Sequence, residues 1–323
     1  MKPFAYASPH SLDDAVALLA NDQDAKFLAG GTDLLTLLKG DLLAPSQLID
    51  IKRLAELDDQ ITLAGDMVRI GALTSLSDLE THPLVAEHAP ALAEAAAVAA
   101  TPQLRNMATI GGNLLQRPRC WYFRDPEIPC WLKGGDSCPA RTGENQHHAV
   151  FDLSPCVAVH PSDPASALLA HDATVEMRGA QGSRTVPLAE LFAPPTDGRR
   201  IETTLQPGEI ITALTLPAVA GRSTYLKAMD RKTWAFALVG VAARVKQDGG
   251  RISEARVVLS GVANVPWRAT AAEQVLVGQK PSSEVLRAAA DAALSGAEPL
   301  TKNGYKLPIV QALVRRALEA TLG

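Results

Sequence analysis

The sequence predicts an α+β protein built from two domains, with the boundary near Gly221. Up to about residue 100, short apolar runs alternate with segments of helical spacing. Beyond Gly221, two long strand-like runs at 235–246 and 251–260 flank a turn at 248–250, and Ala- and Leu-rich helical segments follow. The chain has 323 residues, a length that also favours two domains at about 150 residues each.

The first helix is predicted over residues 12–19. Ser11 can cap it, and Asp13 and Asp14 occupy its first turn, where the helix dipole favours negative charge. Residues 26–29 then form an apolar run that is typical of a short buried strand.

A glycine turn at 30–32 separates this strand from a helix predicted at 33–39, in which leucines recur at helical spacing. The same patterns predict further elements in the first part of the chain: strands at 48–51, 61–64 and 68–70, and helices at 77–80 and 90–100.

Regular patterning is lost between residues 109 and 163, where Pro, Gly, Cys, Trp and charged residues intervene. A loop this long inside a compact domain is uncommon and is usually functional. Strand patterns return at 167–177 and 210–216. In the C-terminal part, amphipathic spacing predicts helices at 269–277, 282–294 and 304–322.

Charge and composition argue against several classes of function. A net charge of −4 and a pI near 6.0 give no electrostatic footprint for nucleic acid or for an anionic membrane. No run approaches the roughly 18 apolar residues that a membrane span needs, and residues 1–20 lack the basic and then apolar pattern of a secretion signal. We therefore expect no nucleic-acid partner, no membrane span and no signal of the chain's own.

Residues 26–34 contain the parts of a phosphate cradle. Glycines allow a sharp turn and a close approach of the backbone to a pyrophosphate, and the following helix offers its positive end. Alone, such a turn is more often a plain connection. The chain lacks both G-x-G-x-x-G and G-x-x-x-x-G-K-[ST], so the dinucleotide fold with that fingerprint and the P-loop are not supported.

Two more motifs make the pattern specific. A second glycine turn lies at 109–113, preceded by Thr-Pro-Gln-Leu-Arg-Asn at 101–106, and residues 160–163 read His-Pro-Ser-Asp. Together the three motifs resemble the flavoproteins of the xanthine dehydrogenase, carbon monoxide dehydrogenase and aldehyde oxidoreductase family. The resemblance covers essentially the whole chain, including residues 225–231 and 256–268.

The resemblance implies the domain plan of the molybdenum hydroxylase flavoproteins. A two-part FAD-binding domain is expected at 1–220, with subdomains of about 1–55 and 56–220. A smaller flavoprotein C-terminal domain of sheet and helices is expected at 221–323.

By the same resemblance, the 26–34 segment wraps the FAD diphosphate, and the second and third motifs lie along the phosphate, ribityl chain and other polar groups. The implied cofactor-binding residues are Lys26, Phe27, Leu28, Ala29, Gly30, Gly31, Thr32, Asp33, Leu34, Thr109, Gly112, Asn113, Ser162, Asp163, Ile211 and Lys227. Ile211 and Lys227 match positions at the adenine or isoalloxazine end. Without the resemblance, Ile211 would be interpreted as a core residue and Lys227 as a surface cation.

The chain has four cysteines, all in the irregular loop: Cys120, Cys130, Cys138 and Cys156. Their clustering predicts a shared ligand. Zinc sites usually contain tight C-x2-4-C pairs, which are missing, and structural disulfides are expected mainly in small exported domains. An iron–sulfur cluster tolerates wide spacing and is favoured over both alternatives.

The resemblance gives a second reason to expect an iron–sulfur cluster. In many members of the family, only a few residues separate the Gly-Gly-Asn turn from the Ser-Asp pair. Here almost fifty residues intervene. The insertion at about 117–156 is similar to the one that holds an extra [4Fe-4S] cluster in the FAD subunits of periplasmic aldehyde oxidoreductase and hydroxybenzoyl-CoA reductase.

His147 and His148 lie in the same loop. Because four thiolates complete a site, a solvated or hydrogen-bonded pair is favoured over a metal-binding role. Four aromatic residues flank the cysteines and are expected to shield the cluster from water: Trp121, Tyr122, Phe123 and Trp131.

No nucleophile, base and acid combination is visible, so we assign no catalytic residue and expect an electron relay. The resemblance implies an oxidoreductase subunit in a heterotrimer. A large subunit would carry the molybdenum cofactor, a small [2Fe-2S] subunit would pass electrons to this chain, and an external acceptor would receive them.

Two other functions stay open at this point. One is a stand-alone flavin reductase or oxidase on the same FAD fold, and the other is a zinc-stabilised assembly subunit without catalysis. The resemblance to periplasmic aldehyde oxidoreductase implies export as a folded complex on a partner's signal, so we expect the periplasm in preference to the cytoplasm.

Overall fold

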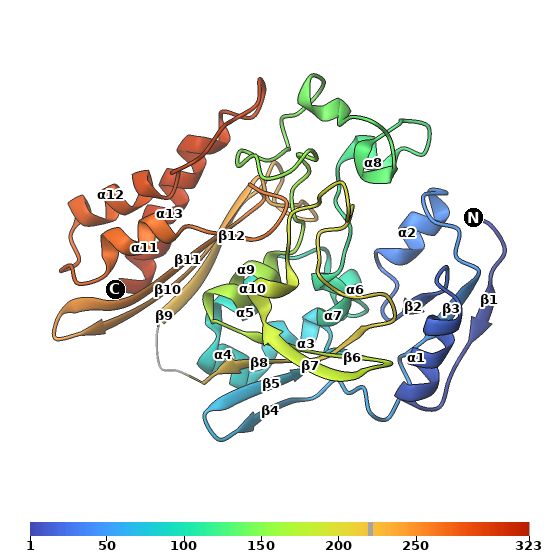
Figure 1. The fold of residues 1–323 in the computed structure, drawn as a ribbon. Helices are drawn as coiled ribbons and strands as arrows, with labels where there is room; N and C mark the ends of the chain where they lie inside the picture. The colour runs from blue at the N-terminus through green and yellow to red at the C-terminus, as the bar shows by residue number, and fades with distance from the viewer. Residues whose placement is uncertain (219–221, 323) are drawn as a thin grey trace.

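The computed structural model describes residues 1–218 and 222–322, in which helices pack on three sheets (Figure 1). A three-stranded sheet belongs to the N-terminal end of the chain, a five-stranded sheet to the middle, and a four-stranded sheet to the C-terminal part. This combination confirms the predicted α+β class. Gly221, the predicted boundary, lies outside the described residues.

The N-terminal unit is a small parallel sheet with the order β1-β3-β2, formed by β1 (Ala5–Ala7), β2 (Lys26–Leu28) and β3 (Gln47–Asp50). Helix α1 (Leu12–Asn21) connects β1 to β2. Its predicted cap is confirmed, because Ser11 Oγ accepts a hydrogen bond from the Asp14 amide at 3.1 Å. The predicted strand, glycine turn and helix are also confirmed, with α2 covering Leu34–Lys39.

The five-stranded sheet has the order β4-β5-β8-β6-β7, and every neighbouring pair is antiparallel. Its strands are β4 (Ile61–Ala64), β5 (Met67–Gly71), β6 (Thr174–Gly179), β7 (Gly182–Pro187) and β8 (Ile210–Pro217). Three helices follow β5: α3 (Leu76–Thr81), α4 (Pro83–His88) and α5 (Pro90–Ala97). The strands and helices predicted before residue 100 are confirmed, and α4, β1 and β7 are additional.

The strand predicted at 167–177 is wrong in its first half. Residues Asp163–Ala170 form helix α9, and β6 begins only at Thr174. Ser162 Oγ accepts a hydrogen bond from the Ala165 amide at 3.1 Å, and Pro164 stands in the first turn, which are both features of a helix start. Because every residue of α9 is buried, the helix has no polar face that would reveal its period in the sequence.

The C-terminal part is an antiparallel sheet with the order β12-β11-β10-β9. Its strands are β9 (Arg222–Ala228), β10 (Val239–Asp248), β11 (Arg251–Ser260) and β12 (Trp267–Arg268). The predicted hairpin is confirmed at Gly249 and Gly250, which both have positive φ. Its first strand begins at Val239, however, and not at residue 235.

Three predicted C-terminal helices are confirmed: α11 (Thr270–Leu276), α12 (Ser283–Ala292) and α13 (Lys306–Leu322). Helices α11 and α13 pack on the four-stranded sheet. Helices α5 and α9 also contact this sheet, so it joins the two parts of the molecule (Figure 1). Tyr225, Ala242 and Val258 from this sheet accordingly belong to the same buried core as the five-stranded sheet.

The predicted irregular segment contains only short helices: α7 (Ile110–Leu114), α8 (Trp121–Arg124), and the 3-10 turns η1 (Trp131–Lys133) and η2 (Pro139–Arg141). Two other one-turn helices are α6 (Pro102–Arg105) and α10 (Leu188–Leu191). The Phe151 ring of this segment stacks on Trp267, with ring centroids 4.3 Å apart. The segment is thereby anchored in the C-terminal core, although it belongs to the middle of the sequence.

No helix in the two described ranges combines the length and the apolar character that a bilayer span requires.

Lys306, in the first turn of α13, binds the irregular segment through its side chain. Its ammonium group is buried and donates to the carbonyl oxygens of His148 at 2.9 Å and Gly261 at 2.7 Å. Burial lowers the pKa of Lys306 to about 7. In the same stretch, the Asn303 side-chain amide donates to the carbonyl oxygens of His148 and Ala149.

We predict that Lys306→Met removes a pH dependence of stability. Between pH 7 and about 10 the unfolded chain binds a proton at Lys306 that the folded chain does not, so this group makes the wild-type protein more stable as pH rises. The contribution is at most about 1.4 kcal/mol per pH unit. Thermal unfolding at pH 7, 8 and 9 should show a wild-type midpoint that rises relative to the variant. In the control Lys302→Met, whose side chain is half-exposed, the midpoint should follow the wild-type trend.

Candidate functional site

A cavity of about 740 Å³ lies between the N-terminal unit and the five-stranded sheet. Most residues of the three predicted motifs line it, namely Lys26, Phe27, Ala29, Gly30, Gly31, Thr32, Asp33, Leu34, Thr109, Gly112 and Asn113, together with Ile211 from β8. Segments far apart in the sequence are thus brought to one cavity. Leu28, Ser162 and Lys227 line neither this cavity nor the smaller one described below.

The Gly30-Gly31 turn needs glycine at both positions for different reasons. A Cβ on Gly30 would lie 1.7 Å from the carbonyl oxygen of Met107, so the two backbones can approach only without a side chain. Gly31 has φ +71°, and a Cβ there would point at the Leu28 and Leu35 side chains. Glycine is therefore required at this position by the backbone conformation.

The second glycine motif is the start of a helix, not only a turn. Thr109 Oγ1 accepts a hydrogen bond from the Gly112 amide at 3.3 Å, and both glycines lie inside α7. Asn113 of this helix accepts a hydrogen bond from Ser162 Oγ at 2.5 Å. The second and third motifs are thus joined directly, and Ser162 contacts a residue of the cavity wall without lining the cavity itself.

A smaller cavity of about 310 Å³ lies beside the cysteine loop. Its lining includes Cys120, Asp163 and Ser260, and residues 234–238, which precede β10. Arg119 and His160 line both cavities. The two cavities therefore meet at these two side chains.

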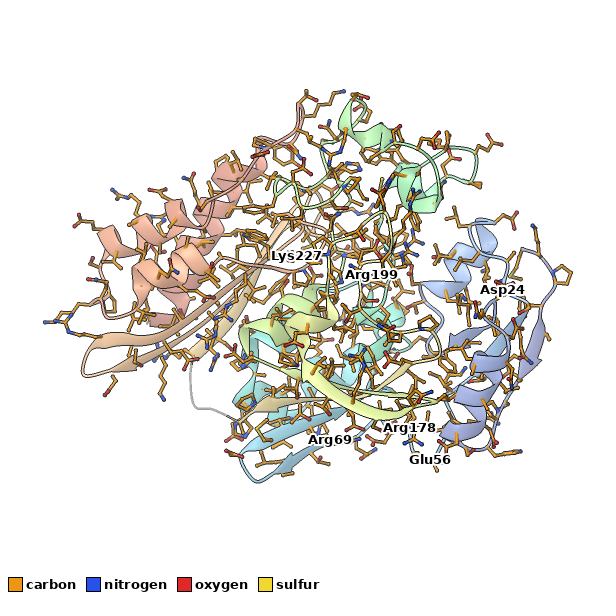
Figure 2. The ribbon with its side chains drawn as sticks, in the orientation of Figure 1. Asp24, Glu56, Arg69, Arg178, Arg199 and Lys227 are labelled. Carbon is orange, nitrogen blue, oxygen red and sulfur yellow. The ribbon has the colours of Figure 1, made fainter. Side chains whose placement is uncertain are left out.

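Asp163 is the centre of a buried network. Its Oδ2 is 2.8 Å from Lys227 Nζ, and its Oδ1 accepts from the Tyr225 hydroxyl at 2.6 Å. Lys227 lies near the middle of the molecule (Figure 2), and its side chain is only 2% exposed, so the reading of this residue as a surface cation is wrong. Burial first, and the Asp163 charge second, raise the pKa of Tyr225 well above its usual value.

The four cysteines gather in one apolar cluster. Cys130 and Cys156 are buried together with Phe123, Trp131 and Leu132, and Cys120 and Cys138 pack against the same group. Of the four aromatic residues expected to shield a cluster, Phe123 and Trp131 are buried, whereas Trp121 and Tyr122 are partly exposed. All four cysteines are free.

The thiols interact with one another. A hydrogen bond between Cys138 and Cys156 lowers the pKa of Cys138 to about 6, and the same bond, with burial, raises the pKa of Cys156. Burial raises the pKa of Cys120 to about 12. Within residues 1–218 and 222–322, no three His, Cys, Asp or Glu side chains are arranged to hold a single metal ion.

The two histidines of the loop differ. His148 is buried, and its Nε2 lies 3.1 Å from Cys120 Sγ, so the expectation of a hydrogen-bonded residue is confirmed here. His147 is exposed and stands edge-on to Trp121.

Asp33 ties the first glycine turn to the base of the cysteine loop. Its carboxylate accepts from the Arg117 amide at 2.9 Å and from Arg124 Nη2 at 2.9 Å, and it also pairs with Arg119 Nη1. Burial acts to raise the pKa of Asp33, but the Arg119 and Arg124 charges prevail and hold it below the usual value. This carboxylate thus connects the two candidate sites.

Sequence reasoning missed four polar residues that line the cavities: Arg117, Arg119, His160 and Glu202. His160 belongs to the His-Pro-Ser-Asp motif, in which only Ser162 and Asp163 are predicted to bind the cofactor. Burial lowers the pKa of His160 to about 4. Glu202 pairs with Arg117 at 3.1 Å across a gap of more than eighty residues, and no local pattern signals such a pair.

Comparison with known protein families bears on this arrangement. Residues 2–219 match the family described as the FAD binding domain in molybdopterin dehydrogenase, and residues 224–321 match the CO dehydrogenase flavoprotein C-terminal domain. The chain belongs to the molybdopterin dehydrogenase flavoprotein family. It is thus an FAD-binding oxidoreductase subunit, as the resemblance implies.

Individual members of the flavoprotein family are similar over nearly their whole length. The chain is 40% identical to the aldehyde oxidoreductase FAD-binding subunit PaoB of Escherichia coli K12, covering 100% of this chain and 98% of that protein. It is 32% identical to the carbon monoxide dehydrogenase medium chain of Hydrogenophaga pseudoflava, covering 98% and 96%. A solved structure of carbon monoxide dehydrogenase from the same organism superposes with a TM-score of 0.79 at 34% identity, covering 99% and 98%.

We predict that Asp33→Asn destabilises this flavoprotein by about 2–3 kcal/mol, because it leaves two largely buried guanidinium groups without their carboxylate. The depressed pKa of Asp33 contributes stability above about pH 4, and this contribution is lost as pH falls further. Denaturant unfolding of the wild type and the variant should therefore show the full difference in stability at pH 7 and a difference that shrinks steadily as the pH is lowered below about 4. Asp13→Asn, in an exposed pair with Arg178, is the control and should change stability by less than about 1 kcal/mol.

Proposed function

We propose that this chain is the FAD- and [4Fe-4S]-containing electron-transfer subunit of a heteromeric molybdenum-dependent aldehyde oxidoreductase. It takes electrons from a small [2Fe-2S] subunit and passes them to an external acceptor, while a large subunit with the molybdenum cofactor oxidises the substrate. The observation that carries the proposal is the position of Cys120, which belongs to the cysteine cluster and lines the same cavity as Asp163.

The larger cavity fits the diphosphate and adenosine half of FAD. Its volume of about 740 Å³ lies in the range of cofactor sites, and it is lined by the Gly30-Gly31 turn, where the lack of side chains lets the backbone approach a phosphate. Arg119 adds a cation whose Nε is buried without a hydrogen-bond partner, a group that suits a phosphate oxygen. Ile211 adds an apolar contact from β8.

The remaining predicted residues fit the proposal in two ways. Thr109, Gly112 and Asn113 line the larger cavity, which shares Arg119 and His160 with the smaller one. Asp163 faces this smaller cavity and is the residue available to the flavin end. Ser162 and Lys227 support the cofactor indirectly, through Asn113 and Asp163.

The cysteine cluster fits a [4Fe-4S] group in the number, chemistry and enclosure of its ligands. Four thiols meet in an apolar environment formed by Phe123, Trp131 and Leu132. FAD accepts electron pairs and releases them singly, so a cluster beside it suits a relay.

Partners and location belong to the same proposal. The relatives that match over nearly their whole length carry the names of medium or FAD-binding subunits. A heterotrimer with the large and small subunits, exported to the periplasm on a partner's signal, is the assembly that the resemblance to periplasmic aldehyde oxidoreductase supports.

We predict that Cys156→Ser lowers the iron content of the purified chain from about four irons and abolishes the cluster signal in paramagnetic resonance of the reduced protein. Cys156 is buried at the centre of the cluster, so loop order and FAD content should fall as well. Ser137→Ala, next to Cys138 but exposed, should keep the iron. One zinc per wild-type chain, or two disulfides, would refute the assignment.

We also predict that the isolated chain does not oxidise aldehydes and gains this activity only in its complex. The proposal assigns it no residue for substrate chemistry, so turnover has to come from the molybdenum subunit. Aldehyde-dependent dye reduction should be measured for the chain alone and for the chain co-expressed with both partners. Robust turnover by the isolated chain would instead support a self-sufficient flavoenzyme.

A further inference from the structure

Glu202 has an unused carboxylate oxygen in the larger cavity. Its side chain is 7% exposed, and its Oε2 lies 3.1 Å from Arg117 Nε. The other oxygen, Oε1, is buried and has no hydrogen-bond partner. Glu202 lines the larger cavity but not the smaller one.

An unpaired buried acceptor of this kind is unfavourable by itself. Buried polar atoms are nearly always hydrogen-bonded, and a missing partner leaves the full desolvation cost in place. Burial also raises the pKa of Glu202, against the opposing effect of the Arg117 charge. A ligand group that donates a hydrogen bond to Oε1 would remove this cost.

The place of Glu202 indicates which part of the cofactor supplies the donor. In the proposed arrangement, the FAD diphosphate lies at the Gly30-Gly31 turn and Arg119, and the flavin end lies at Asp163 in the smaller cavity. Because Glu202 lies only in the larger cavity, it faces the adenosine half. That half carries ribose hydroxyls and an adenine amino group, which are all hydrogen-bond donors.

We propose that Glu202 accepts a hydrogen bond from the adenosine half of FAD and so selects FAD over FMN, which lacks that half. The inference rests on the proposed position of FAD in the larger cavity. Arg117 Nε lies 3.1 Å from one carboxylate oxygen as an ion pair and leaves the other oxygen, Oε1, available to the cofactor.

Glu209 offers a matched control, because it lines the same cavity without a free oxygen. Arg184 donates to its Oε1 at 2.6 Å and to its Oε2 at 2.8 Å, and the Gln206 amide donates to Oε2 at 2.7 Å. Both oxygens are thus occupied within the protein, and a change at Glu209 should not affect one flavin more than the other.

The decisive variant is Glu202→Gln, studied in the full chain after removal of flavin. Arg117 requires an acceptor, so the amide oxygen should turn to it and the NH2 group should face the cavity, where it cannot accept a hydrogen bond. FAD affinity should fall about tenfold or more, while FMN affinity should change less than about twofold. The ratio of the two dissociation constants, measured by flavin fluorescence quenching, should stay unchanged in Glu209→Gln.

Loss of the Glu202 charge beside Arg117 should lower the thermal midpoint of the flavin-free protein, because it weakens a buried ion pair. This structural effect weakens FAD and FMN binding alike, so the ratio of the two dissociation constants separates it from a contact with the adenosine half. If Glu202→Gln does not fold, Glu202→Asp, which keeps the charge beside Arg117 but withdraws the carboxylate, should still reduce the preference for FAD. An unchanged FAD-to-FMN ratio in the folded variant overturns the inference.

A second substitution tests the cofactor position on which the inference rests. Gly31→Val forces a branched side chain onto φ +71° and should yield flavin-poor protein. If Gly31→Val is flavin-poor but Glu202→Gln keeps the wild-type ratio of FAD to FMN dissociation constants, only the role of Glu202 is rejected. Normal FAD binding in Gly31→Val would instead reject the position of the cofactor itself.

Discussion

The carboxylate of Asp33 is the constraint on which the rest of the site depends. It stands directly after the first glycine turn and holds the Arg117 amide and two guanidinium groups at the base of the cysteine loop. Arg119, one of these partners, lines both cavities and precedes Cys120. The path of the loop and the position of the turn are therefore set by one buried ionic contact.

The far end of the loop is held by a different part of the chain. Lys306 and Asn303 bind the carbonyl oxygens around His148, and Phe151 stacks on Trp267. The loop is thus fixed at one end by the N-terminal unit and at the other by the C-terminal domain. Disturbing either contact should affect both proposed cofactors, because the cysteines and the residues around Asp163 share this support.

Sequence patterns predicted the elements whose periodicity or glycine chemistry is local. They succeeded for the capped helix after Ser11, for the turn at Gly30-Gly31 and for the C-terminal helices. They failed for α9, because a helix buried on all sides shows no amphipathic period. They also could not place Lys227 or Glu202, since burial and pairing there depend on residues at distant positions in the chain.

The contacts that hold the two ends of the cysteine loop lie far apart in the sequence, and their order along the chain has a consequence for biosynthesis. Asn303 and Lys306 come far later in the sequence than the four cysteines, so they leave the ribosome well after them. Asp33 precedes the cysteines and can bind the base of the loop early, whereas the carbonyl oxygens of His148 and Ala149 gain these partners only when Asn303 and Lys306 have been made. The far end of the cysteine loop is therefore fixed late in synthesis.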